Sequence, residues 1–169
     1  MKEVITNLEK IKQLAAERES ENDAFRTFLK AKDSKKIDSV VHALNNVITP
    51  EIDCTQCGNC CKSLLISVTK KETERLAGLL QTSITETKAK YIEEGESGNM
   101  LLNKIPCHFL EGTKCSIYEN RFADCREFPH LHQNNFTSRL FSMMMHYGTC
   151  PIIFNVLEEL KTATGFKKN

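Results

Sequence analysis

Apolar residues recur at helical spacing along the first fifty positions of the chain. The first such set is Val4, Leu8, Ile11, Ala15, Phe25, Phe28 and Leu29. A second apolar stripe runs from Ile37 to Ile48, after Asp33 or Ser34, either of which can cap a helix. Pro50 ends this stripe. Residues 1–50 therefore predict an N-terminal helical hairpin.

Two capping signals follow in the middle of the chain. Thr69 and Ser83 are each followed three residues later by a glutamate, which is the pattern of a capping box. They predict helices over residues 69–80 and 83–92. The segment Leu64–Val68 before them favours an extended conformation.

The later part of the chain is less regular. Residues 100–105 and 115–118 favour short strands or irregular segments, whereas residues 136–145 fit a strand or a helix. Pro151 suits the first turn of a last helix, which Gly165 ends. The patterns together predict a small α+β fold that is mostly helical.

Charge and hydropathy limit the binding partners and the cellular location that the sequence predicts. The chain has 169 residues with 23 basic and 22 acidic side chains, so its net charge of +1 gives no electrostatic reason to bind nucleic acid or an anionic membrane. No apolar run approaches the roughly 20 residues of a transmembrane helix. Met1–Glu21 lacks the apolar core of a secretory signal. We expect a cytoplasmic protein.

Eight cysteines then suggest the chemistry. They are Cys54, Cys57, Cys60, Cys61, Cys107, Cys115, Cys125 and Cys150. In a reducing compartment such clusters bind metal more often than they form disulfides or serve as buried thiols. The first four read C-x-x-C-G-x-C-C, where each two-residue spacing lets sulfurs face one metal and Gly58 eases the turn. Residues 51–169 are therefore predicted to form an irregular, metal-stabilised domain.

Cys60 and Cys61 are adjacent, and neighbouring side chains of an extended chain point to opposite sides. This predicts two centres rather than one. The first would contain Cys54, Cys57, Cys60 and Cys150. The second would contain Cys61, Cys107, Cys115 and Cys125.

The sulfur ligands fit both zinc and an iron–sulfur cluster. The run C-x-x-C-x-x-C with a distant Cys150-Pro151 is similar to the ligand pattern of four-iron ferredoxins, which favours iron–sulfur by a small margin. Basic residues near the ligands can tune such a centre by hydrogen bonds to sulfur, namely Lys62, Lys114, Arg121 and Arg126. Histidines that could replace a cysteine are His108, His130, His132 and His146.

Several spaced motifs carry a family resemblance. The block Cys-Thr-Gln-Cys-Gly-Asn-Cys-Cys is followed in order by Pro106–Leu110, Cys115–Tyr118, Arg121 and Cys125–Pro129. The chain from Cys54 to Cys150 resembles the YkgJ-type cysteine-cluster (CxxCxxCC) family, whose name records zinc or iron chelation. One departure is Phe122, where the family usually has proline.

The resemblance implies metal binding and leaves the use of the metal open. The first alternative is a metal-binding module, in which the centre serves structure or electron transfer. The second is a cluster-dependent enzyme, because the flagellin lysine methylase is similar in its cluster. The third is a zinc-stabilised adaptor for a protein partner. Four thiolates that fill the coordination shell would favour a structural role of the metal, whereas an open ligand position would favour a catalytic role.

Overall fold

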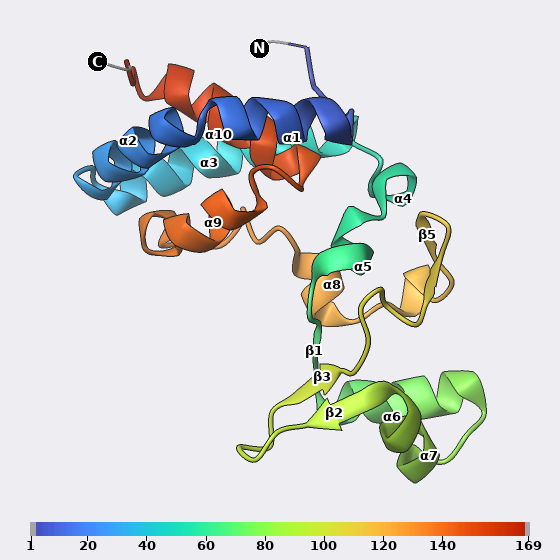
Figure 1. Cartoon of the computed structure of the whole chain (residues 1–169). Coiled ribbons are helices and arrows are strands. Elements are labelled where there is room, and N and C mark those ends of the chain that lie inside the picture. The colour runs from blue at the N-terminus through green and yellow to red at the C-terminus, as the bar shows by residue number, and fades with distance from the viewer. Residues whose placement is uncertain (1–2, 168–169) are drawn as a thin grey trace. The chain divides into compact units, whose positions relative to one another are not determined.

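The computed structural model describes residues 3–167 and has the predicted α+β, mostly helical fold (Figure 1). Its contacts divide the chain into two compact units. The helical unit combines the residues up to Asp53 with those from Pro129 onward, and the cysteine unit is Cys54–Phe128. The domain boundary predicted after residue 50 stays a prediction. Among the described residues, no helix has the length and apolar character needed to cross a membrane.

The helical unit is built from the two ends of the chain. Its elements are α1 (Leu8–Glu17), α2 (Glu19–Lys30), α3 (Ser34–Ile48), η1 (Thr49–Glu51), η3 (Phe136–Arg139), α9 (Leu140–His146) and α10 (Pro151–Ala163). The last helix begins at Pro151, as predicted, and packs against α1, α3 and α9 (Figure 1). Residues 136–145, which fitted a strand or a helix, are helical.

Local signals explain most of these helix starts. The Asn7 side chain accepts a hydrogen bond from the Lys10 amide at 2.9 Å, and Asp33 caps α3 in the same way. The apolar face predicted over residues 4–29 is continuous in the core, where Ile11, Phe25 and Leu29 are fully buried. The helix itself is interrupted, because the backbone at Arg18 is not helical (φ −104°, ψ 13°). The predicted hairpin is therefore three helices.

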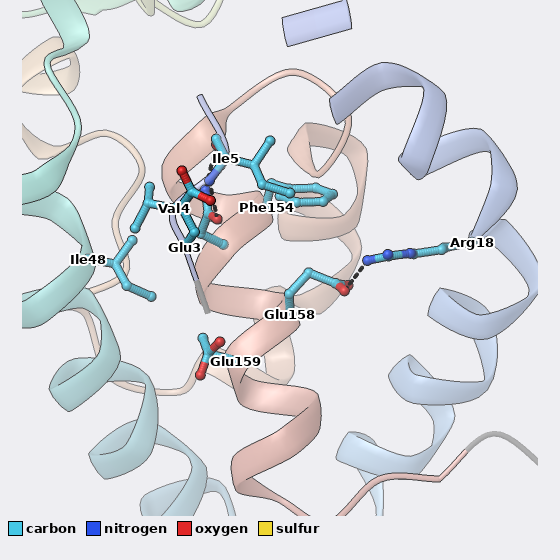
Figure 2. A pocket seen from close by; sticks show the side chains of 9 residues that line it. Glu3, Val4, Ile5, Arg18, Ile48, Phe154, Glu158 and Glu159 are labelled. Atoms are coloured by element: carbon cyan, nitrogen blue, oxygen red, sulfur yellow. Dashed lines mark hydrogen bonds and ion pairs between the residues drawn. The ribbon is translucent and has the colours of Figure 1, made fainter. Parts of the chain in front are cut away.

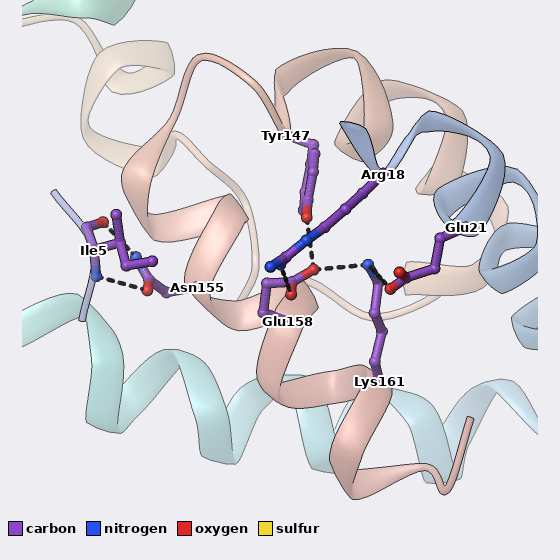
Figure 3. Close-up of polar contacts among 7 residues, drawn as sticks. All are labelled: Ile5, Arg18, Glu21, Tyr147, Asn155, Glu158 and Lys161. Atoms are coloured by element: carbon purple, nitrogen blue, oxygen red, sulfur yellow. Dashed lines mark hydrogen bonds and ion pairs between the residues drawn. The ribbon is translucent and has the colours of Figure 1, made fainter. Parts of the chain in front are cut away.

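A partly buried polar network centred on Glu158 lies against this core (Figure 3). The Glu158 carboxylate accepts hydrogen bonds from the Tyr147 hydroxyl at 2.6 Å and the Lys161 ammonium at 2.7 Å. It also forms an ion pair with Arg18, and Lys161 contacts Glu21 at 2.7 Å. Burial and the Glu158 carboxylate raise the pKa of Tyr147, so its hydroxyl stays protonated and donates. The network joins α1, α2, α9 and α10.

The extended residues before α1 are held by one side chain of α10. Asn155 accepts a hydrogen bond from the Ile5 amide at 2.9 Å and donates one to the Ile5 carbonyl at 2.8 Å (Figure 3). A small pocket remains beside this segment, with Ile48 and Phe154 among its walls (Figure 2). Asp38 of α3 similarly binds a distant backbone, because it accepts the amide protons of Asn135 and Phe136.

The cysteine unit has short elements around a small sheet. They are α4 (Cys54–Cys57), α5 (Asn59–Ser63), β1 (Ser67–Val68), α6 (Lys70–Leu80), α7 (Ile84–Tyr91), β2 (Ile92–Glu94), β3 (Met100–Leu102), β4 (Leu110–Glu111), β5 (Lys114–Cys115), η2 (Tyr118–Asn120) and α8 (Ala123–Glu127). The antiparallel sheet has the order β1-β3-β2, with Val68 opposite Met100 and Ile92 opposite Leu102. Strands β4 and β5 form a separate antiparallel hairpin.

Both predicted capping boxes are present, at Thr69 with Glu72 and at Ser83 with Glu86. Glu72 also makes a long-range contact: its second carboxylate oxygen accepts a hydrogen bond from the Ala123 amide at 2.7 Å. The bond ties the start of α6 to the start of α8. The core of the unit is formed by Ile66, Val68, Leu76, Ile92, Met100, Leu102, Phe109 and Phe122.

Candidate metal centre

Seven of the eight predicted ligands lie in the cysteine unit. Helix α4 carries Cys54 and Cys57, α5 carries Cys60 and Cys61, the loop after β3 carries Cys107, β5 carries Cys115, and α8 carries Cys125. Cys150 is in the helical unit, where it is 8% exposed at the N-cap of α10. Cys54 is exposed, and the other six cysteines of the cysteine unit are half-buried.

The turn between α4 and α5 depends on Gly58. Its backbone is left-handed (φ 59°, ψ 7°), as its place after the C-x-x-C pair predicted. A Cβ at this position would lie 2.6 Å from the Thr113 carbonyl oxygen and 2.8 Å from the Thr113 Cα. The glycine therefore lets α4 and α5 approach the turn of the β4–β5 hairpin, which carries Cys115.

Replacing Gly58 with alanine is expected to damage the site. The left-handed backbone alone costs a residue with a Cβ about 1–2 kcal/mol, and the collision with the Thr113 backbone adds to that cost. The measurement is chemical denaturation together with metal content. Gly78→Ala is the matched control, because nothing lies within 4 Å of a Cβ there and alanine favours a helix by about 0.8–1 kcal/mol. Equal stability of the two variants would contradict this role of Gly58.

The adjacent pair Cys60–Cys61 differs from the prediction. Both residues lie in helix α5, so the assumption of an extended chain is wrong. In a helix, the side chains of adjacent residues point about 100° apart rather than to opposite sides. The Cys61 thiol lowers the pKa of Cys60 to about 7, whereas the Cys60 sulfur and burial raise the pKa of Cys61. The reason for assigning the two cysteines to separate centres is thereby removed.

Five thiols are close enough to influence one another's ionisation. They are Cys60, Cys61, Cys107, Cys115 and Cys125. Burial is the largest cause of a raised pKa at Cys107, Cys115 and Cys125, and repulsion from neighbouring sulfurs adds to it. For Cys125 the pKa rises to about 12. Most of these thiols are thus protonated at neutral pH unless a cation stabilises the thiolates.

Backbone contacts bring these five residues together from distant parts of the sequence. The Cys107 amide donates a hydrogen bond to the Cys61 carbonyl at 2.8 Å, which joins the loop after β3 to α5. Cys115 is paired with Leu110 in the β4–β5 hairpin, and α4 packs against β5. Cys107, Cys115 and Cys125 also pack against the apolar core of the unit.

The charged neighbours have different roles. Arg121 opposes the rise in the pKa of Cys115 that burial causes. Arg126 directs a terminal nitrogen to the Arg121 carbonyl rather than to a sulfur. His108, a predicted substitute ligand, has its Nε2 atom 2.6 Å from the Asn103 side-chain oxygen.

The donor set fits a soft metal in its chemistry. Five sulfurs exceed the four that tetrahedral zinc or an iron–sulfur cluster needs. Across residues 3–167, however, no three Cys, His, Asp or Glu side chains are placed so that they could hold a metal ion as they stand. Binding would therefore require the thiols to rotate toward one point, as is common where metal binding is coupled to folding.

Sequence reasoning identified the cysteines but missed two devices that position them. One is the β4–β5 hairpin, whose two-residue loop has Gly112 at φ 65°. A glycine between two short strand-like segments is a recognised hairpin signal and was available in the sequence. The other is the link from Glu72 to the Ala123 amide, two residues before Cys125. It joins residues 51 positions apart, and no local pattern shows it.

A small unit in which helices and short strands bring several cysteines together is typical of cysteine-rich metal-binding proteins. Comparison with known families agrees: the model of the CxxCxxCC family, a putative zinc- or iron-chelating domain, matches residues 53–145. This is more than half of the 169-residue chain, and the chain belongs to this family. No curated protein and no solved structure matches it. Membership supports metal binding, with zinc or iron as the metal.

Proposed function

We propose that the protein holds one zinc- or iron-containing centre through thiolates of the cysteine unit. The observation that carries this proposal is the gathering of five half-buried sulfurs from α5, β5, α8 and the loop after β3. Apolar surroundings raise the free-energy cost of the thiolates, and a bound cation offsets it.

The proposed ligands come from Cys60, Cys61, Cys107, Cys115 and Cys125. Helix α4, which carries Cys54 and Cys57, packs against β5, so these two cysteines are further candidate ligands. Cys150 belongs to the other unit, and the ferredoxin-like pattern that includes it gains no support from this grouping. One centre is therefore favoured over the two that the sequence predicted, and the small preference for an iron–sulfur cluster over zinc is reduced.

The centre has a structural role in this proposal. Apart from α6 and α7, the cysteine unit consists of short helices and of strands of two or three residues, and the cysteine-bearing helices α4, α5 and α8 contribute no buried residue to its apolar core. A tetrahedral four-thiolate site would join four of these elements at one point. A catalytic role, like that of a lysine methylase, or an adaptor role would require a substrate or partner surface, and the gathering of thiols favours neither.

Quantification of metal in cysteine variants tests the proposal. The full chain is purified without oxygen, and its zinc, iron and acid-labile sulfide are measured with the visible spectrum. We expect Cys61→Ser to lose most of the metal, because Cys61 follows Cys60 in α5 and its carbonyl accepts the Cys107 amide. Cys150→Ser is the control and should retain it. Iron with equimolar sulfide and visible absorption would identify a cluster, and zinc alone would identify a structural zinc site.

Two outcomes would contradict the proposal. Full metal content in Cys61→Ser would exclude this residue and the group around it. Complete metal loss in Cys150→Ser, with its helical content unchanged, would instead support the predicted ligand set that contains Cys150. A circular dichroism spectrum of each variant separates loss of a ligand from loss of the fold.

A further inference from the structure

A second feature of the cysteine unit is a pocket rich in positive charge. Its lining residues are Thr69, Lys71, Glu72, Arg75, Ala123 and Arg126. Three of them are cationic and one is anionic, so the formal charge of the lining is +3 − 1 = +2. No cysteine lines the pocket, and its residue Arg126 directly follows the proposed ligand Cys125.

Two guanidinium groups of this pocket are bound to the same atom. A terminal nitrogen of Arg75 donates to the Arg121 carbonyl at 3.2 Å and to the Asn120 carbonyl at 3.1 Å. A terminal nitrogen of Arg126 donates to that same Arg121 carbonyl. Two like charges are thus held near one carbonyl oxygen, and a bound anion would reduce their repulsion beyond what Glu72 does for Arg75. Each guanidinium has five N–H donors, and these bonds use one nitrogen of each group.

The one carboxylate of the pocket is already engaged. One oxygen of Glu72 accepts hydrogen bonds from the Thr69 amide at 2.9 Å and the Thr69 hydroxyl at 2.8 Å. The other oxygen accepts the Ala123 amide at 2.7 Å. Both Glu72 oxygens therefore bind groups at the starts of α6 and α8, and the Glu72 charge also attracts Arg75.

We propose that this pocket binds the phosphate group of a small molecule. Planar guanidinium groups pair with oxyanions through two parallel hydrogen bonds, and the ammonium of Lys71 adds a third positive charge. A phosphate presents three or four oxygens to the three cationic side chains that line the pocket, whereas a carboxylate presents only two. The inference does not depend on which metal the cysteines hold, and it assigns the protein a second ligand.

Titration of the full chain with inorganic phosphate, followed by NMR, tests this site. Ionic strength is held constant with chloride, and the signals of the Arg75 and Arg126 side chains and the Lys71 amide are observed. We expect saturable shifts at these three residues. Lys71→Ala should weaken binding about fivefold, in line with the modest strength of exposed ion pairs. Lys70→Ala is the matched control, because Lys70 is an exposed neighbour on α6 that does not line the pocket.

Parallel titrations with glycerol phosphate and acetate distinguish the source and the class of the anion. Tighter binding of the phosphomonoester identifies a phosphorylated small molecule, and tighter binding of inorganic phosphate identifies the free ion; both support the proposal. Acetate binding as tight as phosphate overturns it. Equal weakening by Lys70→Ala and Lys71→Ala also overturns it, because this indicates diffuse attraction, and so does a linear response without saturation. Metal content measured before and after the titration shows whether the cysteine centre is unaffected.

Discussion

Removal of the metal is expected to unfold most of the Cys54–Phe128 unit and to leave the helices of the other unit largely formed. Structural zinc contributes about 10–16 kcal/mol in small peptides, which is comparable with the roughly 5–15 kcal/mol by which whole domains are stable. The helical unit has its own apolar core, including Phe25, Val41 and Leu157, and does not depend on thiolates for burial.

Hydrogen exchange measured with and without a chelator checks this expectation. Amides of β2, β3 and α6 should lose their protection, whereas those of α3 and α10 should retain most of theirs. Metal analysis of the same sample confirms that the chelator has worked. Unchanged protection of the sheet after verified metal loss would show that the apolar core around Leu76 and Leu102 is sufficient by itself.

Glu158→Ala is expected to lower the free energy of unfolding by about 2–3 kcal/mol, less than the loss typical of a fully buried ion pair, because the Arg18 and Glu158 side chains are 32% and 16% exposed. The change leaves Lys161, which is 6% exposed, with Glu21 as its remaining anionic partner within residues 3–167. It also removes the acceptor of the Tyr147 hydroxyl. These losses exceed that of any single surface contact because the groups remain buried after the carboxylate is gone.

Chemical denaturation of the full chain, monitored by helical circular dichroism, measures this effect. Glu17→Ala is the matched control: Glu17 is an exposed glutamate of α1 and should change stability by no more than about 0.5 kcal/mol. A loss below about 1 kcal/mol for Glu158→Ala would mean that Arg18, Tyr147 and Lys161 find other partners or reach solvent, and that the network does not hold α1, α2, α9 and α10 together.

Signals that act within one turn of helix were readable from the sequence. The pairs Thr69 with Glu72 and Ser83 with Glu86 predicted two helix starts, because a capping box needs only residues three apart. The break at Arg18 was not readable: the apolar spacing continues through it, and its side chain is fixed by Glu158, 140 positions away. Long-range pairing overrides local pattern at such positions.

In the candidate site, too, the sequence predicted the features that depend on local spacing and missed those that depend on the tertiary fold. Spacing identified the cysteines and the need for Gly58, because both depend on the local turn. Spacing misjudged Cys60 and Cys61, because two residues carry no periodicity that separates a helix from an extended chain. Which sulfurs gather depends on the backbone bond between Cys107 and Cys61 and on the hairpin at Cys115, and both are products of the tertiary fold.

The helical unit is formed from both ends of the chain, so its two parts leave the ribosome at different times. Helices α1 to α3 emerge first, but α10, which packs against α1 and α3, emerges only after the whole of Cys54–Phe128. The sulfur-bearing residues of that segment are therefore available to a metal co-translationally, while the earlier helices still lack their last partner. We expect metal uptake to precede closure of the helical core during biosynthesis, since a segment that is contiguous in sequence closes shorter loops than one formed from both ends of the chain.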